Sequence, residues 1–306
     1  MSNAPPGPLE RYRGALLGLA AGEALGAPLE FMSANQIQIR HGMVDAMVGG
    51  GWLDLRRGEW TDDTAMALAL ATSLVEKKGL DPADAAARYL ELYRKGAKGL
   101  ANTVRSALAE IDGGTPVADA SRKIAEEAAG ETDSSSALGR TAPIGLWYHA
   151  DRRALVRASL DEARITHHDP RVGGAAAAIN LILAEFLTGD SDLPALLERV
   201  NEALFANEEG ALNVLPVIEG KSLLELRPSE DVVDTLEVAL VSLVSTKSFR
   251  DAVVTAVNLG GNTATIGAVC GALAGCAYGA GGIPKDWLTP LKDRNLIEQA
   301  ARRMLA

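Results

Sequence analysis

Residues 14–26 read GALLGLAAGEALG, and residues 267–279 read GAVCGALAGCAYG. Each stretch is apolar and carries a glycine at every fourth position, namely Gly14, Gly18, Gly22 and Gly26 in the first and Gly267, Gly271, Gly275 and Gly279 in the second. Side chains four residues apart form a ridge along one face of an α-helix. A row of glycines makes a groove instead, into which another backbone can fit closely.

Eight helical glycines need a structural reason, because each costs about 0.8–1 kcal/mol relative to alanine. We therefore predict that both stretches are helices in the crowded centre of the fold, each packed closely against a neighbouring backbone, and that each is a candidate partner for the other. The alternative is a drift of composition toward Ala and Gly with no packing role. That alternative would leave the glycine faces exposed.

The rest of the chain also favours helix over strand. Alanine-rich runs such as residues 174–187, GAAAAINLILAEFL, have high helix propensity. No long alternation of β-branched or aromatic residues appears. We predict one almost wholly helical domain over residues 9–306, after a flexible N-terminal tail at 1–8. Helices are expected at 9–25, 61–79, 82–95, 99–112, 116–129, 153–164, 171–188, 192–206, 231–244, 249–257, 264–278 and 288–305, with a polar loop at 130–145.

Size and charge narrow the class of protein. The chain has 306 residues, of which 47% are hydrophobic and only 4% aromatic, so a large core must be built from small and aliphatic side chains. The net charge of −10 argues against a basic surface for nucleic acid or membranes. Residues 252–284 carry no charge and are long enough to cross a membrane. Their Gly- and Ala-rich composition, without an aromatic belt, favours a buried helix.

The two cysteines, Cys270 and Cys276, lie six residues apart in one expected helix. They face different directions there, so we expect no disulfide between them. A cytoplasmic location is the simpler expectation for such a chain. The N-terminal sequence MSNAPPGP has no apolar core and does not resemble a signal peptide.

The strongest candidate functional stretch is 58–68, GEWTDDTAMAL, where Thr61, Asp62, Asp63 and Thr64 stand at the expected start of a helix. Threonine and aspartate are common helix N-caps, and acids suit the helix dipole. One acid is enough for that purpose. Two adjacent acids flanked by hydroxyls also supply the hard oxygen ligands that Mg²⁺ requires, so a cap and a metal site both remain open.

Three further stretches carry candidate polar groups. In 165–171, ITHHDPR, His167 and His168 precede a helix start, and their imidazoles could contact a ligand or be solvated; no zinc pattern accompanies them. In 22–31, GEALGAPLEF, Glu30 follows a proline and is a candidate general base in a loop. In 257–267, VNLGGNTATIG, Gly261 belongs to a Gly-Gly turn that enters a helix, where an anion or a metal can bind.

Together the four motifs resemble the ADP-ribosylglycohydrolase family, in particular its dinitrogenase reductase-activating glycohydrolase branch. They are GALLGLAAGEALGAPLEF, GEWTDDTAMALAL, ITHHDP and AVNLGGNTATIGAVCGALAGCAYG, in this order over nearly the whole chain. The resemblance implies a compact all-α fold, a single-domain orthogonal helical bundle. It also implies cleavage of ADP-ribose from a protein side chain, often arginine, in a cleft that holds two Mg²⁺ or Mn²⁺ ions.

The resemblance assigns roles to particular residues. Thr61, Asp62 and Asp63 match the first metal-binding cluster, and Thr265 matches the last residue of the second. Glu30 matches a mobile glutamate over the cleft. His167 matches a residue that helps to bind ADP-ribose, and the segment with Ser135, Ser136 and Arg140 matches a loop that approaches it.

Two departures from the family pattern qualify these roles. The second metal cluster of the family reads Asp-x-Asp-Thr, whereas this chain has Asn262-Thr263-Ala264-Thr265. The family's Gly-Asn-Gly-x-x-Met-Arg is here residues 134–140, SSSALGR. With only Asp62 and Asp63 left to balance charge, two dications would be poorly compensated. We therefore expect one Mg²⁺ or Mn²⁺ ion, held by Thr61, Asp62 and Asp63 with Asn262 and Thr265 as further ligands.

Three functions remain open at this stage. The first is a metal-assisted hydrolase, with Glu30, Asp62 and Asp63 in catalysis, that acts on an ADP-ribosylated protein or small conjugate and is impaired or altered by the lost aspartates. The second is a homologue that binds ADP-ribose without cleaving it. The third is a structural protein with a vestigial cleft.

Overall fold

The computed structural model describes residues 5–128, 134–189, 193–206 and 214–306. Helices connected by turns make up the fold, and the described residues form isolated bridges but no named strand. Most buried apolar side chains belong to one continuous core. The all-α, single-domain prediction is confirmed. Residues 1–4 of the expected N-terminal tail lie outside the described residues, and the first helix begins at Pro8.

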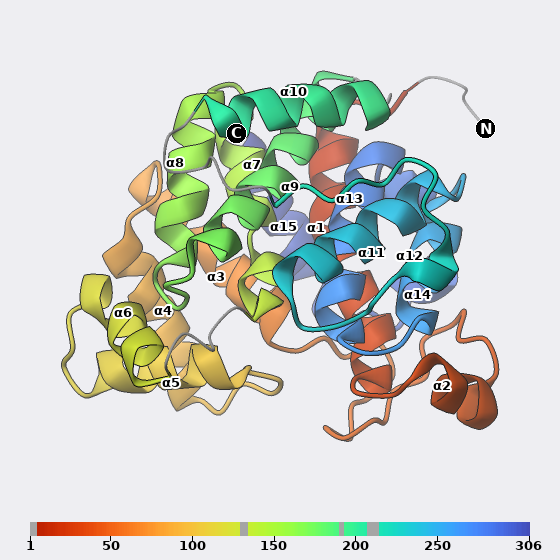
Figure 1. The fold of residues 1–306 in the computed structure, drawn as a ribbon, viewed down its shortest axis with the longest axis horizontal. Helices are drawn as coiled ribbons and strands as arrows, with labels where there is room; N and C mark the ends of the chain where they lie inside the picture. Colours follow the sequence, from red (N-terminus) through yellow and green to blue (C-terminus); the bar gives the residue numbers. More distant parts are fainter. Residues whose placement is uncertain (1–4, 129–133, 190–192, 207–213) are drawn as a thin grey trace.

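Two antiparallel helices, α1 (Pro8–Gly26) and α13 (Thr263–Tyr278), form the centre of the molecule, and Figure 1 shows them surrounded by the other helices. The surrounding helices are α2 (Ala34–His41), α3 (Asp62–Lys77), α4 (Pro82–Arg94), α5 (Asn102–Asp112), α6 (Val117–Glu127), α7 (Ala142–Tyr148), α8 (Arg152–Ala163), α9 (Pro170–Thr188), α10 (Leu193–Phe205), α11 (Val232–Val244), α12 (Phe249–Asn258), α14 (Lys285–Leu288) and α15 (Arg294–Leu305).

The glycine rows of α1 and α13 face each other. A Cβ added to Gly18 would lie 2.1 Å from the carbonyl oxygen of Gly271, and one added to Gly271 would lie 2.1 Å from that of Gly18. The same reciprocal contact joins Gly14 to Gly275. No side chain larger than hydrogen fits at these positions, which explains why the chain accepts the helix-propensity cost of glycine there.

One glycine of the predicted rows has a different role. Gly279 has a φ of +73° and ends α13, so it is a C-terminal cap and lies outside the row. At the other end of the contact, Gly26 meets the backbone of Thr263. This contact brings the end of α1 to the start of α13, where the polar Asn262 and Thr265 stand.

Capping residues explain several helix starts. Asp169 accepts a hydrogen bond from the backbone N–H of Arg171 (2.8 Å), and Pro170 occupies the first helical position of α9. Helix α9 is long and apolar enough to span a membrane by length and composition, but 83% of its most hydrophobic window is buried inside the fold. Residues Ala175–Ala178 are all buried, so α9 is a core helix here.

Three segments differ from the sequence prediction. Helix α2 lies in a stretch expected to be loop, and α7 begins inside the loop predicted at 130–145. Of the helix predicted at 288–305, only the part from Arg294 onward is the helix α15, because the short helix α14 ends at Leu288 and Pro290 follows it. Proline lacks the N–H that a continuous helix would need at that point.

Candidate active site

The side chain of Glu23, which reaches from α1, caps helix α3. Its Oε1 accepts hydrogen bonds from the N–H of Thr61 (2.9 Å), the hydroxyl of Thr61 (2.6 Å) and the N–H of Asp63 (3.2 Å). Its Oε2 accepts from the N–H of Thr64 (3.0 Å) and from the Thr64 hydroxyl. Thr61, at the N-cap position, makes no side-chain cap of its own. A carboxylate from another helix therefore satisfies the N–H groups that open α3.

This arrangement leaves the carboxylates of Asp62 and Asp63 free of the capping role that their sequence position suggested. Both are buried, with 8% and 3% of their surface exposed. The Thr61 hydroxyl also lies 3.3 Å from Oδ1 of Asp62, and the side chain of Thr265 opposes the rise in the pKa of Asp63. Thr265 belongs to α13, so the expected first and second clusters meet at the starts of two helices.

The acidic cluster formed by Glu23, Glu30, Asp62 and Asp63 concentrates negative charge in a buried place. Burial, followed by repulsion from Glu23 and Glu30, raises the pKa of Asp62 to about 7. Burial and repulsion from Asp62 raise the pKa of Asp63 well above its usual value. Hydroxyl and backbone donors oppose these shifts, and the charge of Arg140, which interacts with Asp63, also opposes the rise in the pKa of that group.

Glu30 lies in the loop after α1, half-buried at the edge of this cluster. Burial raises its pKa to about 7, and the hydrogen bond from the indole Nε1 of Trp52 to its Oε2 (2.9 Å) acts in the opposite direction. The loop is fixed by Gly261: its carbonyl accepts from the N–H of Phe31 (2.9 Å), and its N–H donates to the carbonyl of Met32 (2.8 Å).

Gly261 has a φ of +74°, and a Cβ at this position would lie 1.6 Å from the carbonyl oxygen of Pro228. Only glycine fits this backbone. The structure thus places Gly261 as the support of the Glu30 loop, while its predicted contact with a ligand stays a prediction. Sequence inspection found the residue but not this function, because the partner segments at 31–32 and 228 are distant in the chain.

A chain of hydrogen bonds runs behind the cluster. The guanidinium of Arg140 donates from Nε to Glu162 (2.7 Å) and from a terminal nitrogen to the hydroxyl of Thr166 (2.8 Å). The Thr166 hydroxyl lies 2.8 Å from Nδ1 of His167, and Nε2 of His167 lies 3.1 Å from the hydroxyl of Ser136. After accepting from Arg140, the Thr166 hydroxyl keeps its proton and one lone pair, so it can pair with Nδ1 of His167 in either tautomer of the neutral ring.

Burial, together with the charge of Arg140, lowers the pKa of His167 to about 3, so the ring is neutral at physiological pH. The side chains of Arg140 and His167 are almost fully buried and engaged within the protein. In this geometry they hold the segment with Ser136 in place, and their predicted contact with a ligand is untested. Ser136, which is 9% exposed, is the member of this chain closest to the surface.

Asn262 and Ser135 are joined directly. The Nδ2 of Asn262 donates to the hydroxyl of Ser135 (2.8 Å), which also accepts from the hydroxyl of Thr235 (2.9 Å). Ser135 is fully buried. The side-chain nitrogen of Asn262 is thus engaged, and its side-chain oxygen, Oδ1, is the atom left for a ligand.

Ala264 has an apolar environment. It forms a small cluster with Ala27 and Leu55, and Leu53 packs against them. A carboxylate at this position, as the resemblance would place there, would face these apolar groups. The surroundings of Ala264 therefore suit an alanine.

Two glycines that sequence inspection did not single out shape the acidic cluster. A Cβ on Gly139 would lie 2.2 Å from Cγ of Asp63, and a Cβ on Gly99 would lie 2.4 Å from Oδ1 of Asp62. Each carboxylate is therefore held against a glycine backbone. Gly99 has a φ of +90°, which itself favours glycine.

The comparisons with known proteins identify the family. The sequence model described as ADP-ribosylglycohydrolase matches residues 4–306. The chain belongs to the ADP-ribosylglycohydrolase family. It is 33% identical to the ADP-ribosyl-[dinitrogen reductase] glycohydrolase of Rhodospirillum rubrum, over 97% of this chain and 94% of that one. It is 31% identical to the ADP-ribosylarginine hydrolase Tri1 of Serratia proteamaculans, over 97% and 79% of the two chains.

A solved structure titled "ADP-ribosylglycohydrolase-related protein complex" has the same fold. The TM-score is 0.81, with 33% sequence identity, and the alignment covers 97% of each chain. In this chain the fold places the starts of α3 and α13 together. The acidic cluster is therefore the candidate active site of this member of the ADP-ribosylglycohydrolase family.

The donor set suits a single hard cation. Among the described residues, no group of three or more His, Cys, Asp or Glu side chains is arranged to hold a metal. Mg²⁺, however, is commonly bound through one or two carboxylates and completed by water and substrate oxygens. Asp62 and Asp63 provide two such carboxylates, and their raised pKa values reflect negative charge that a cation would offset.

Proposed function

We propose that this protein is a hydrolase that removes ADP-ribose from a modified side chain, with arginine as the side chain tested first. Two relatives are named for such reactions, one on dinitrogen reductase and one on ADP-ribosylarginine. The observation that carries the proposal is the acidic cluster itself. Asp62 and Asp63 are buried and freed from capping by Glu23, and their pKa values are raised by burial and by the neighbouring carboxylates.

A single Mg²⁺ or Mn²⁺ ion would be held by Asp62 and Asp63, with oxygens of Thr61, Asn262 and Thr265 as further candidate ligands. When bound, it would polarise the ribose oxygens and orient the sugar. Glu23 keeps both aspartates in position by anchoring the N–H groups at the start of α3.

Glu30 is the candidate proton-transfer residue. Its pKa of about 7 gives it both protonation states near neutral pH, as general acid–base catalysis requires. The Trp52 indole fixes one of its oxygens and leaves the other available. The exposed rings of Phe31 and Trp52, whose centroids are 5.7 Å apart, stand beside it at the edge of the site. These two rings offer aromatic faces to the modified side chain or its protein.

The test is the release of free ADP-ribose from an ADP-ribosyl-arginine peptide in the presence of Mg²⁺ or Mn²⁺. We expect release by the unmodified chain and its loss in Asp62→Ala and in Glu30→Gln, while Lys247→Ala, an exposed change far along the chain, retains it. Release that is equal in all four proteins would contradict the assignment.

A second function is favoured by one observation, the apolar surroundings of Ala264 and the occupied amide of Asn262. Asn262 and Ala264 stand where the family pattern has aspartates. The absence of these two carboxylates would suit a protein that binds ADP-ribose without cleaving it. Calorimetry with ADP-ribose distinguishes the two proposals. Binding that depends on Asp62, together with no release under any metal condition, would favour the binding function.

The expected cytoplasmic location also stays a proposal. Cys270 and Cys276 are buried free thiols, which fits a reducing compartment.

A further inference from the structure

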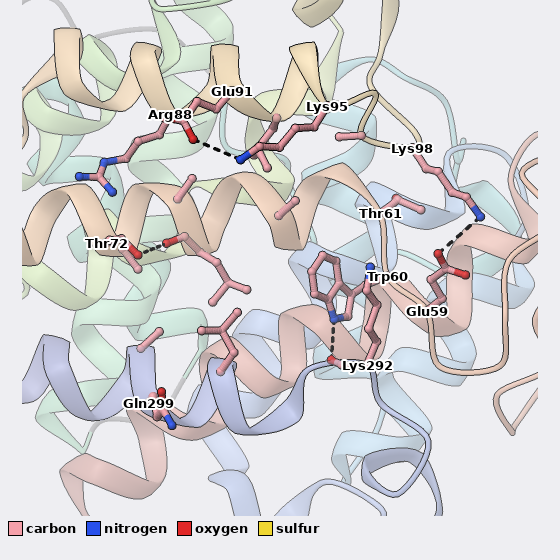
Figure 2. Close-up of a pocket in the computed structure, with 18 of the residues that line it drawn as sticks. Glu59, Trp60, Thr61, Thr72, Arg88, Glu91, Lys95, Lys98, Lys292 and Gln299 are labelled. Carbon is pink, nitrogen blue, oxygen red and sulfur yellow. Dashed lines mark hydrogen bonds and ion pairs between the residues drawn. The ribbon is translucent and has the colours of Figure 1, made fainter.

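A second concavity lies between α3, α4 and α15, with a volume of about 580 Å³. Figure 2 shows α4 and α15 on either side of α3, with side chains from all three helices converging on the space between them. A volume of this size is typical of pockets for small molecules. Neither the family match nor the acidic cluster accounts for it.

The floor of this trough is an apolar stripe on α3. Ala65, Leu68, Ala69, Thr72 and Val75 recur at spacings of three or four residues, line the trough, and are each half-buried. The stripe extends about 15 Å along the helix axis at 1.5 Å per residue. Its one polar group, the hydroxyl of Thr72, already donates to the carbonyl of Leu68 (2.8 Å). The floor therefore offers an unpartnered apolar surface and no free hydrogen-bonding group.

The side walls add to this apolar surface. Leu92 of α4 and Leu296 and Ala300 of α15 also line the trough. Leu296 is 52% exposed. An apolar body in the trough would cover these side chains together with the floor, which is favourable by about 25 cal/mol for each Å² removed from water.

Positive charge gathers on the rim, although the whole chain has a net charge of −10. The lining includes five basic side chains, Arg88, Lys95, Lys98, Lys292 and Arg303, against two acids, Glu59 and Glu91. Four of the five basic groups have carboxylate partners: Arg88 pairs with Asp84 and Glu76, Arg303 with Glu76, Lys95 with Glu91, and Lys98 with Glu59.

Lys292 is different. Its Nζ lies 4.2 Å from the centroid of the Trp60 ring, and within the described part of the chain no carboxylate forms an ion pair with it. The indole of Trp60 is itself fixed, because its Nε1 donates to the carbonyl of Lys292 (2.7 Å). Figure 2 shows Lys292 and Lys98 at the end of the trough where Trp60 and Thr61 lie. This end therefore holds a positioned ammonium group that makes no ion pair among the described residues, although Glu59 lies near enough for the charge of Lys292 to lower the pKa of its carboxyl.

We propose that the trough binds a small amphipathic carboxylate, with its carboxylate against Lys292 and its apolar body over Ala65, Leu68 and Ala69. The charge at one end and the apolar stripe beyond it set this orientation. A helix of a partner protein is a poorer fit, because a helix with its side chains is about 10–12 Å wide and the volume suits a smaller body. The site lies beside the proposed hydrolase centre, because Thr61 lines the trough and also belongs to the acidic start of α3, but its test does not depend on that activity.

The experiment is calorimetric titration of the full chain with decanoate below its micelle concentration, with decyltrimethylammonium as a probe that has the same tail and the opposite charge. We expect one decanoate to bind per chain, and we expect decyltrimethylammonium not to displace it. Lys292→Ala should weaken binding by about tenfold, as for the loss of one charge-assisted hydrogen bond. Ala69→Phe, which fills the floor, should weaken it as well, and Lys247→Ala, an exposed lysine on another part of the surface, should not change it.

Because Lys292 is exposed, its variant is expected to fold, and thermal melting of each variant checks this. The proposal is overturned if decanoate does not bind the unmodified chain. It is also overturned if decyltrimethylammonium binds the same site equally well, or if Lys292→Ala binds decanoate as tightly as the unmodified chain. Loss of ADP-ribose release has no bearing on these outcomes.

Discussion

Substitution of Gly18 by alanine tests the contact between α1 and α13. The added Cβ would lie 2.1 Å from the carbonyl oxygen of Gly271 and 3.0 Å from a ring carbon of Phe249, whereas ordinary contact begins at 3.4 Å. A backbone oxygen cannot turn away as a side chain can. The two central helices must therefore move apart by more than 1 Å, which is about the shortfall in this contact.

The magnitude follows from two opposing effects. Alanine gains about 0.8–1 kcal/mol of helix propensity over glycine. Overpacking of a core costs about 1–3 kcal/mol and sometimes more, and a clash between two backbones belongs at the upper end of that range. We expect a net loss of about 2 kcal/mol in the free energy of unfolding, or a fall of about 3 °C in Tm for a chain of this size.

Thermal unfolding followed by circular dichroism measures this change. The matched control is Gly281→Ala, because Gly281 is exposed and a Cβ there meets nothing within 4 Å. Its Tm should stay within about 1 °C of the unmodified protein, as is usual for surface substitutions. An unchanged or higher Tm for Gly18→Ala would refute the close contact of the two helices.

Three other predictions concern the acidic cluster. Glu23→Gln keeps the shape of the side chain but replaces the carboxylate that accepts the five hydrogen bonds at the start of α3. We expect a loss of about 2 kcal/mol in the free energy of unfolding, measured by urea unfolding. An unchanged unfolding midpoint would count against the capping role. In chelator, Tm should fall as pH rises from about 5 to about 8, since the raised pKa values of Asp62 and Glu30 favour their protonated forms below about 7. Asp62→Asn should reduce that fall, and an equal fall in both proteins would show another cause. Trp52→Phe removes the donor to Glu30 and should shift the pH profile of release to higher pH, whereas an unchanged profile would mean that the indole does not influence Glu30.

The glycine rows and the acidic start of α3 were predictable because they depend on local patterns. A row of glycines at every fourth residue has one economical explanation, close backbone packing, and the structure confirms it for Gly14, Gly18 and Gly22. The C-terminal position of Gly279 was not foreseen, because the same spacing continues into the cap. Short motifs thus indicated the central helix pair without giving its exact ends.

Two helices escaped prediction for different reasons. Helix α2 buries only Ile37, so it lacks a strong apolar period, although the capping box formed by Ser33 and Gln36 was a readable signal. Helix α7 contains Pro143 and Gly145, which argue against helix in sequence. Gly145 is explained only by its neighbour in space, since a Cβ there would lie 2.9 Å from the Cα of Asn180.

The functional details that sequence missed are all tertiary. Glu23 caps a helix whose N-cap residue, Thr61, lies 38 residues later in the chain, and nothing in the local sequence of α1 indicates this partner. Likewise, His167 and Arg140 were noted as candidate ligand residues, but their burial and their hydrogen bonds to Thr166 appear only in the folded chain. Residue type predicted which groups carry chemistry, and packing determined which of them support the site from behind.

The central claim is that Asp62 and Asp63 hold one divalent ion on which ADP-ribose release depends. The most direct measurement is the initial rate of release from an ADP-ribosyl-arginine peptide as Mn²⁺ is titrated into chelator-treated protein, with binding of Mn²⁺ measured in the same samples by electron paramagnetic resonance. The account predicts that the rate rises in step with the occupancy of one site, and that Asp62→Asn abolishes both. Release that persists in chelator, or a rate that requires two bound ions, would contradict it.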